Sequence, residues 1–78
     1  MIKLEKIKNS KSNGYFYHPE NTADVGMIEI KGDEVVVVVE SNRDKELGVP
    51  YYANKARAEV LRLLKAGQLV DEKLLAWY

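Results

Sequence analysis

The clearest hydrophobic pattern in the chain lies between Met27 and Glu40, where two β-favouring runs flank a Gly-Asp pair. The segment reads MIEIKGDEVVVVVE, with alternating apolar and polar residues followed by five consecutive valines. A Gly-Asp pair between two such runs is typical of a two-residue hairpin with glycine in the first turn position. The pattern therefore predicts strands over residues 25–31 and 34–40.

This turn also fixes which residues face each other across the hairpin. Lys31 faces Glu34, and the pairing continues to Met27 opposite Val38. Because side chains alternate between the two faces of a strand, one face is wholly apolar. It consists of Ile28, Ile30, Val35, Val37 and Val39. We expect this face to form the core beneath a helix, and the other face to be mixed, with an apolar island at Met27, Val36 and Val38.

Two further strands are predicted before the hairpin. Residues 2–5 alternate, and Ile7 then breaks the alternation by one position, which a bulge near Glu5–Lys6 or a slightly twisted edge strand would explain. Asn-Gly at positions 13–14 indicates a turn, and the aromatic run YFYH after it predicts a short strand that ends at Pro19.

A long helical pattern covers residues 50–66. Proline at position 50 suits the first turn of a helix, and Gly67 is a natural end. The apolar residues on one face of this helix are Tyr52, Ala53, Ala56, Val60, Leu63 and Leu64. In the tail, Asp71 and Glu72 suit the start of a second, short helix that must dock to be stable.

These elements predict a single compact α+β domain over residues 1–78. We expect an antiparallel four-stranded sheet with one main helix packed on one face and a short C-terminal helical turn. A chain of this length buries only about 60% of the surface that its unfolded form exposes, so it has room for one core.

Composition narrows the classes of function. The chain has 46% hydrophobic and 31% charged residues, a formal net charge of zero and no cysteine. Disulfides and thiolate metal sites are therefore excluded, and no broad cationic field attracts nucleic acid. The longest apolar run, the five valines, is far shorter than the roughly 20 residues of a membrane span. We expect a soluble, cytoplasmic protein that does not bind membranes.

The residues that could support catalysis are few. His18 is the sole histidine, and Glu20 and Asp24 are its nearest carboxylates in sequence. The three could form an acid–base set or a weak cation site, but a strand-end histidine in an acidic loop is the simpler interpretation. The glycines are isolated, so no phosphate-binding loop is present. We expect no enzyme activity, no cofactor and no metal.

The apolar residues of the mixed face raise a different hypothesis. Valine suits any strand, so Val36 and Val38 could simply be half-exposed. Alternatively, the tail LLAWY covers them, or another chain does. We therefore expect a non-catalytic protein-interaction or assembly module, with a homodimer as one form of it. The candidate interface residues are Met27, Val36, Val38, Trp77 and Tyr78.

Nucleic-acid binding is the alternative. The rings of an aromatic strand can stack on bases, and a basic helix stripe can contact phosphates. The candidate residues are Tyr15 and Tyr17 on the strand, and Lys55, Arg62 and Lys65 on the helix.

The C-terminal part of the chain also carries a resemblance. It reads PYYANKARAEVLRLLKAGQLVDEKLLAWY, with a Tyr-Tyr helix start, an Ala/Leu helix, a glycine stop and a terminal Trp-Tyr. This pattern resembles small uncharacterised proteins of phages and mobile elements of Gram-positive bacteria. The resemblance covers the last 30 or so residues and implies an accessory role, with binding favoured over catalysis.

Overall fold

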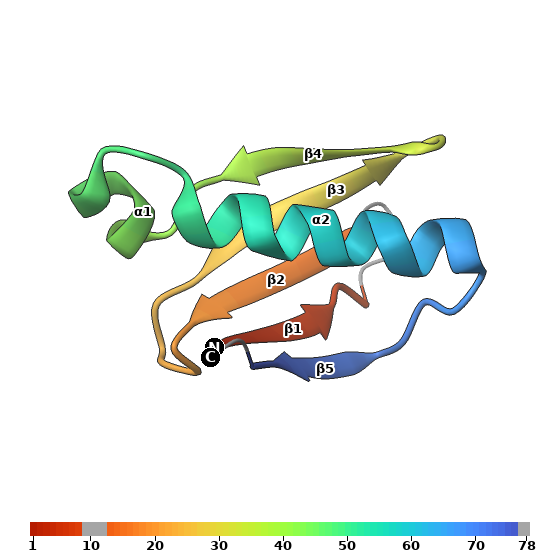
Figure 1. The fold of residues 1–78 in the computed structure, drawn as a ribbon, viewed down its shortest axis with the longest axis horizontal. Helices are drawn as coiled ribbons and strands as arrows, with labels where there is room; N and C mark the ends of the chain where they lie inside the picture. The colour runs from red at the N-terminus through yellow and green to blue at the C-terminus, as the bar shows by residue number, and fades with distance from the viewer. Residues whose placement is uncertain (9–12, 77–78) are drawn as a thin grey trace.

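The structure is a computed structural model that describes residues 1–8 and 13–76. In chain order its elements are β1 (Ile2–Lys6), β2 (Gly14–Pro19), β3 (Gly26–Lys31), β4 (Glu34–Val39), α1 (Asn42–Leu47), α2 (Tyr51–Ala66) and β5 (Glu72–Leu75) (Figure 1). All neighbouring strands are antiparallel, in the order β4-β3-β2-β1-β5. Within the two described ranges, no helix has the length and apolar character needed to span a membrane.

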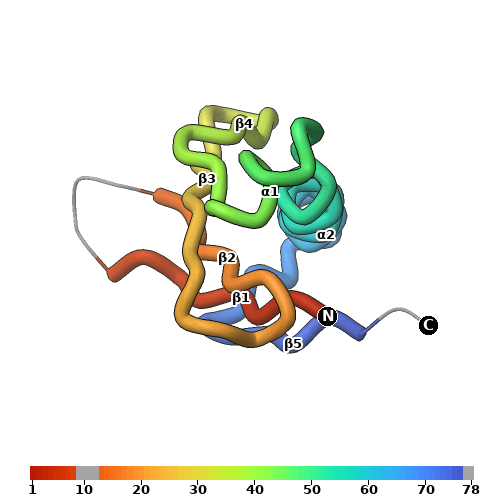
Figure 2. Tube along the Cα trace, turned by 90° about the vertical axis from the view of Figure 1, so that its left-hand side faces the viewer, coloured from red at the N-terminus to blue at the C-terminus, as the bar shows by residue number. Residues whose placement is uncertain are grey.

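The fold has two layers. Both helices lie on one side of the sheet, and no helix formed by the described residues covers the other side (Figure 2). The core forms between α2 and the strands, which confirms the predicted α+β class and the single main helix on one face. Its buried residues are Ile2, Leu4, Tyr15, Tyr17, Ile28, Ile30, Val35, Tyr52, Ala53, Ala56 and Val60.

The β3–β4 hairpin has the predicted turn and most of the predicted register. Gly32 has a φ of 67°, a value that favours glycine, and the pairs from Lys31–Glu34 to Ile28–Val37 are those expected. The register then shifts, so that Met27 pairs with Val39 instead of Val38.

This shift corrects the predicted faces of the valine run. Because Val38 is the extra residue of a bulge, Val39 changes sides and lies opposite Met27, away from the core. Val38 and Val39 are each 44% exposed, whereas Val35 is buried and Val37 packs against the core. The prediction that Val39 belongs to the core was therefore wrong.

The main helix follows its predicted pattern closely. Its buried residues are Tyr52, Ala53, Ala56, Val60 and Leu63, and Leu64 is partly buried. Gly67 ends the helix with a φ of 66° and donates its N–H to the carbonyls of Leu63 and Leu64.

The short helix α1 was not expected, although the sequence carries a signal for it. The hydroxyl of Ser41 accepts a hydrogen bond from the N–H of Asp44, and Gly48 ends the helix with a φ of 74°. A serine three positions before an acidic residue is a common helix start.

Asp44 in turn caps the helix that follows. Pro50 makes no side-chain cap at the start of α2. The Asp44 carboxylate, only 1% exposed, accepts instead from the N–H groups of Tyr52 (2.7 Å) and Ala53 (3.1 Å). The hydroxyl of Tyr17 also donates to it at 2.7 Å. This buried carboxylate therefore joins α1, α2 and the centre of the sheet.

The C-terminal segment is a strand, not the predicted helix. β5 pairs antiparallel with β1, from Ile2 opposite Leu75 to Glu5 opposite Glu72, so the sheet has five strands instead of four. A helix of so few residues is marginal in water, whereas a strand satisfies the free backbone edge of β1. On that edge, the N–H of Lys6 also donates to the carbonyl of Asp71 at 2.7 Å.

Of the two explanations for the break at Ile7, the bulge is absent from the first strand, and the strand is not at an edge of the sheet because it lies between β2 and β5. Residues 2–6 pair without a shift with residues 19–15 of β2. Ile7 breaks the alternation because β1 has already ended at Lys6. Its side chain is nevertheless buried, and its N–H donates to the carbonyl of Gly14.

Candidate interaction surfaces

The open face of the sheet, the side that the helices leave uncovered, has an apolar centre. Phe16 on β2 lies directly opposite Met27 on β3, and Val36 lies on β4 opposite Glu29. Phe16 is 37% exposed, and Met27 and Val36 are half-buried. Phe16, Met27 and Val39 therefore form an apolar row across three strands, with Val36 beside it on β4, and no described part of the chain covers these four residues.

The predicted interface residues divide between this face and other places. Met27 and Val36 lie on the open face, as expected. Val38 is exposed at the bulge, and so is beside the row instead of within it. Trp77 and Tyr78 lie outside the described residues. Phe16 was not among the predicted interface residues, but it lies beside Met27 on the open face. Because side chains alternate along a strand, Phe16 must point to the face of β2 opposite to that of Tyr15 and Tyr17.

The free edge of β4 is a second apolar surface. β4 is the last strand on its side of the sheet, and within residues 1–8 and 13–76 no backbone hydrogen bond joins it to any segment other than β3. An edge strand of this kind is a template for pairing with another strand, and proteins usually protect it with lysine, proline or a bulge. In β4 the bulge comes only at Val38.

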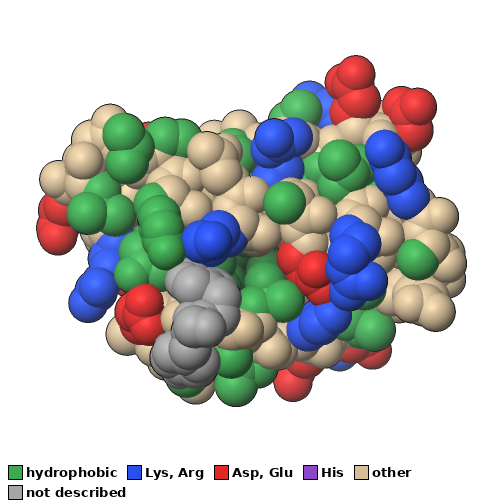
Figure 3. Space-filling model, in the orientation of Figure 1, with side chains coloured by type: hydrophobic (Ala, Val, Ile, Leu, Met, Phe, Trp, Pro, Cys, Tyr) green, Lys and Arg blue, Asp and Glu red, His purple; other side chains and the backbone are tan. Residues whose placement is uncertain are grey.

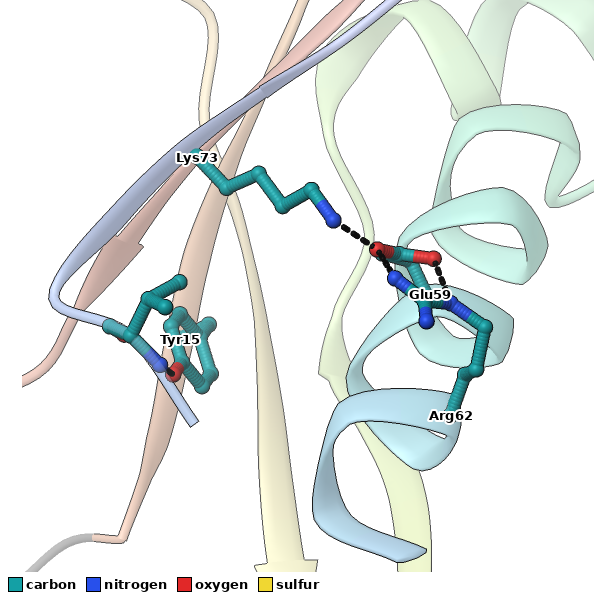
Figure 4. Close-up of polar contacts among 5 residues, drawn as sticks. Tyr15, Glu59, Arg62 and Lys73 are labelled. Atoms are coloured by element: carbon teal, nitrogen blue, oxygen red, sulfur yellow. Dashed lines mark hydrogen bonds and ion pairs between the residues drawn. The ribbon is translucent and has the colours of Figure 1, made fainter. Parts of the chain in front are cut away.

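The other edge of the sheet is better protected. β5 has four residues, two of them charged, Glu72 and Lys73. Lys73 donates to Glu59 of α2, which also binds Arg62 at 2.6 Å (Figure 4). The hydrogen bond from Arg62 comes first among the causes that lower the pKa of Glu59 to about 2, ahead of the contacts with Lys73.

A tyrosine of the core fixes the segment that leads into β5. The hydroxyl of Tyr15 donates to the carbonyl of Val70 and accepts from the N–H of Val70 at 3.1 Å (Figure 4). Burial raises the pKa of Tyr15 above its ordinary value. With these contacts and the Glu59 ion pairs, the β5 edge is tied to the domain from two sides.

A groove of about 340 Å³ runs along the free edge of β4 beside α2. Its apolar lining comes from Val35, Val36 and Leu61. Four charged side chains line the rest: Asp33 and Glu34 from the hairpin end, and Arg57 and Lys65 from α2. Neither Arg57 nor Lys65 forms an ion pair with a described residue.

The structure does not bring together the proposed acid–base set of His18, Glu20 and Asp24. The ring of His18 lies on the open face, with its Nε2 at 2.7 Å from Oε1 of Glu5. Glu20 accepts instead from the hydroxyl of Tyr52 at 2.7 Å, and Asp24 from the N–H groups of α1. No group of three or more possible metal ligands occurs in the described part of the chain.

The two remaining carboxylates have clear electrostatic roles. The hydrogen bond from Tyr52 is the main cause that lowers the pKa of Glu20. Partial burial raises the pKa of Asp24, but the N–H groups of Arg43 and Asn42 at the start of α1 outweigh it, and the net shift is downward. Both side chains thus hold loop and helix ends in place.

The residues of the nucleic-acid alternative are dispersed. Tyr15 and Tyr17 are fully buried beneath α2, so their rings are not free to stack on bases. Arg62 is engaged by Glu59, and Lys55 lies over the ring of Tyr51 at 5.3 Å. The basic side chains on the helix face stand among hydrophobic and acidic ones instead of forming one continuous patch (Figure 3).

Comparison with known proteins identifies no relative of this chain. The resemblance to phage and mobile-element proteins stays a prediction, and function is inferred from the surfaces described above. No family model, curated protein sequence or solved structure matches the chain.

Proposed function

We propose that this protein is a non-catalytic interaction module that associates with a second copy of itself. The observation that supports the proposal is the outer β3–β4 hairpin: among the residues that the structure describes, none covers its apolar side chains on the open face and none pairs with the outer edge of β4. A small domain that exposes apolar residues together with a free strand edge gains stability when another chain covers them.

The net charge of the chain is compatible with binding to a second copy of itself. The formal net charge is zero, so no long-range repulsion keeps two copies apart. Closed two-fold dimers are also the commonest assemblies of soluble proteins. The C-terminal resemblance to phage and mobile-element proteins favours binding over catalysis, so an accessory role in such an element belongs to the same proposal.

The test is the association state of the full chain as a function of concentration, measured by sedimentation velocity. We expect a dimer that dissociates on dilution. Val36→Lys should weaken association while the circular dichroism spectrum stays unchanged, because this side chain is half-buried on the open face beside the edge. Val37→Lys should instead destabilise the fold, because Val37 packs against the core.

Val49→Lys is the matched control. Val49 lies between α1 and α2, is 58% exposed and is not part of the sheet. This substitution adds the same charge and should change neither folding nor association. A wild-type chain that stays monomeric even at millimolar concentration would contradict the proposal.

A further inference from the structure

The edge of β4 and the groove beside it together define one arrangement of a second copy. We propose that two copies pair antiparallel along β4, about a two-fold axis at Val36, so that both sheets join into one and each groove receives the partner's α2. This inference rests on the proposed function and names the surface and register through which self-association occurs.

Only alternate residues of an edge strand point their N–H and C=O groups outward, and this limits the registers in which two copies of β4 can pair. The N–H of Ile30 donates to the carbonyl of Asn13 on the β2 side, so Ile30 and its partner Val35 are a non-hydrogen-bonded pair. Val35 therefore points its N–H and C=O away from β3, toward the free edge. Val37 does the same, because outward groups alternate along a strand.

An added antiparallel strand must bond to these outward-pointing residues. A two-fold axis at Val36 pairs Val35 with the second copy's Val37, and Val37 with its Val35. The pairing then covers residues 34–38 and stops at the bulge on each side. All the paired valines keep their faces: Val35 and Val37 stay beneath the helices, and the two Val36 side chains meet on the open face.

The two neighbouring registers that also join outward-pointing residues are less favourable than the axis at Val36. An axis at Val37 would place Glu34 directly opposite the second copy's Glu40, a like-charge pair that is unfavourable in a sheet, and would extend the pairing into the bulge. An axis at Val35 would pair strand residues only over positions 34–36, because the turn begins at Asp33.

The groove supplies charge complementarity for the axis at Val36. α2 runs antiparallel to β4 and ends near the hairpin (Figure 1). Lys65 therefore lies toward Asp33 and Glu34, and Arg57 lies toward the other end of the groove. The hairpin end carries two acidic side chains and one basic side chain, whereas Arg57 has no acidic neighbour in the groove.

The two-fold axis places the acidic hairpin end of each groove next to the Arg57 end of the other copy's groove. Arg57 lies eight residues before Lys65, about 12 Å along the helix axis, which equals three to four residues of strand. In the dimer, Arg57 of each copy thus approaches Glu34 of the other, and the two half-buried Leu61 side chains face each other near the axis. The added base neutralises the excess acid at each hairpin end.

A charge swap tests this arrangement in the full-length chain. Arg57→Glu alone places an acid near the partner's Glu34, and Glu34→Arg alone places a base near the partner's Arg57. Each variant should dissociate on the order of tenfold more readily than the wild type, since each unfavourable contact occurs twice in a two-fold dimer. Mixed one to one, they should form a heterodimer, because both contacts then join opposite charges.

Lys45→Glu and Glu46→Arg on the exposed surface of α1 are the controls for net charge, and neither should affect association. Sedimentation velocity and circular dichroism report assembly and folding separately. A mixture that does not re-form a dimer overturns the β4 pairing. If the dimer persists in both charge-swap variants but is lost in Phe16→Lys, the interface lies on the open face. In that case the proposed self-association stands, but the proposed β4 pairing is wrong. A wild-type monomer at all concentrations overturns both.

Discussion

Replacing Asp44 by alanine should remove a large part of the stability of the domain. Its carboxylate is 1% exposed and accepts hydrogen bonds from Tyr17, Ser41, Tyr52 and Ala53. Loss of the helix cap alone costs about 1 kcal/mol. This figure covers the N–H groups of Tyr52 and Ala53; the buried hydroxyls of Tyr17 and Ser41, left without their acceptor, cost about 1–3 kcal/mol each, so we expect a total loss of about 3–7 kcal/mol.

That loss is large for a chain of this size. Domains have about 0.05–0.15 kcal/mol of stability per residue, which gives about 4–12 kcal/mol for 78 residues. Asp44→Ala should therefore remove at least about a quarter of the stability, and at the lower end of this range it would leave the protein partly unfolded at about 25 °C. Asp44→Asn keeps one acceptor oxygen and should lose less.

The assay is urea unfolding followed by far-ultraviolet circular dichroism. Asp24→Ala is the matched control, because Asp24 also accepts from N–H groups at a helix start but lies at the surface. We expect it to cost about 1 kcal/mol, as for an ordinary cap. If Asp44→Ala costs no more than Asp24→Ala, the buried carboxylate does not hold the two helices and the sheet together as described.

The remaining predictions concern the β5 edge and the sheet. The pKa of Glu59 falls from an ordinary value of 4.5 to about 2 in the folded protein, so its ion pairs stabilise the fold above pH 4.5, and this contribution is lost as the pH falls toward 2. Glu59→Gln should thus be less stable than wild type at pH 7, with a difference that narrows over this window in urea unfolding; a constant difference would contradict the shift. Gly14→Ala should destabilise strongly, because its Cβ would lie 2.1 Å from the carbonyl oxygen of Ile28; Gly67→Ala meets no neighbour and should show only the milder cost of a positive φ. Equal thermal unfolding of these two variants would contradict the close approach of β2 and β3.

The sequence predicted the parts of the fold that depend on neighbouring residues. The turn at Gly32–Asp33 fixes the local register, and the apolar face of α2 follows helical periodicity up to Gly67. Both signals lie within one element or one hairpin, where side-chain period and turn chemistry decide the structure.

The sequence-based predictions were wrong where contacts with residues far away in the chain determine the local structure. Residues 72–75 carry signals for a short helix, but the free edge of β1, far away in the sequence, makes them a strand. The bulge at Val38 has no local marker, so Val39 was assigned to the wrong face. The capping role of Asp44 also spans two helices, although its pairing with Ser41 could have been read as a helix start.

The candidate surfaces show the same division. Met27 and Val36 followed from alternation on the hairpin, and the structure leaves both on the open face. The groove beside β4 was not predictable, because it depends on where α2 lies over the sheet and which of its charged residues turn toward the edge.

The pairing of β1 with β5 has a consequence for how the chain folds as it is made. β1 emerges from the ribosome before the other strands of the sheet, and its outer edge has no partner until residues 72–75 have been synthesised. Until then, a nascent chain presents an unsatisfied strand edge that includes Ile2 and Leu4. Such edges attract other nascent chains, and pairings between distant segments form slowly. The domain therefore completes its sheet only after translation of β5, and its yield in the cell should depend on chaperones that shield β1 during that interval.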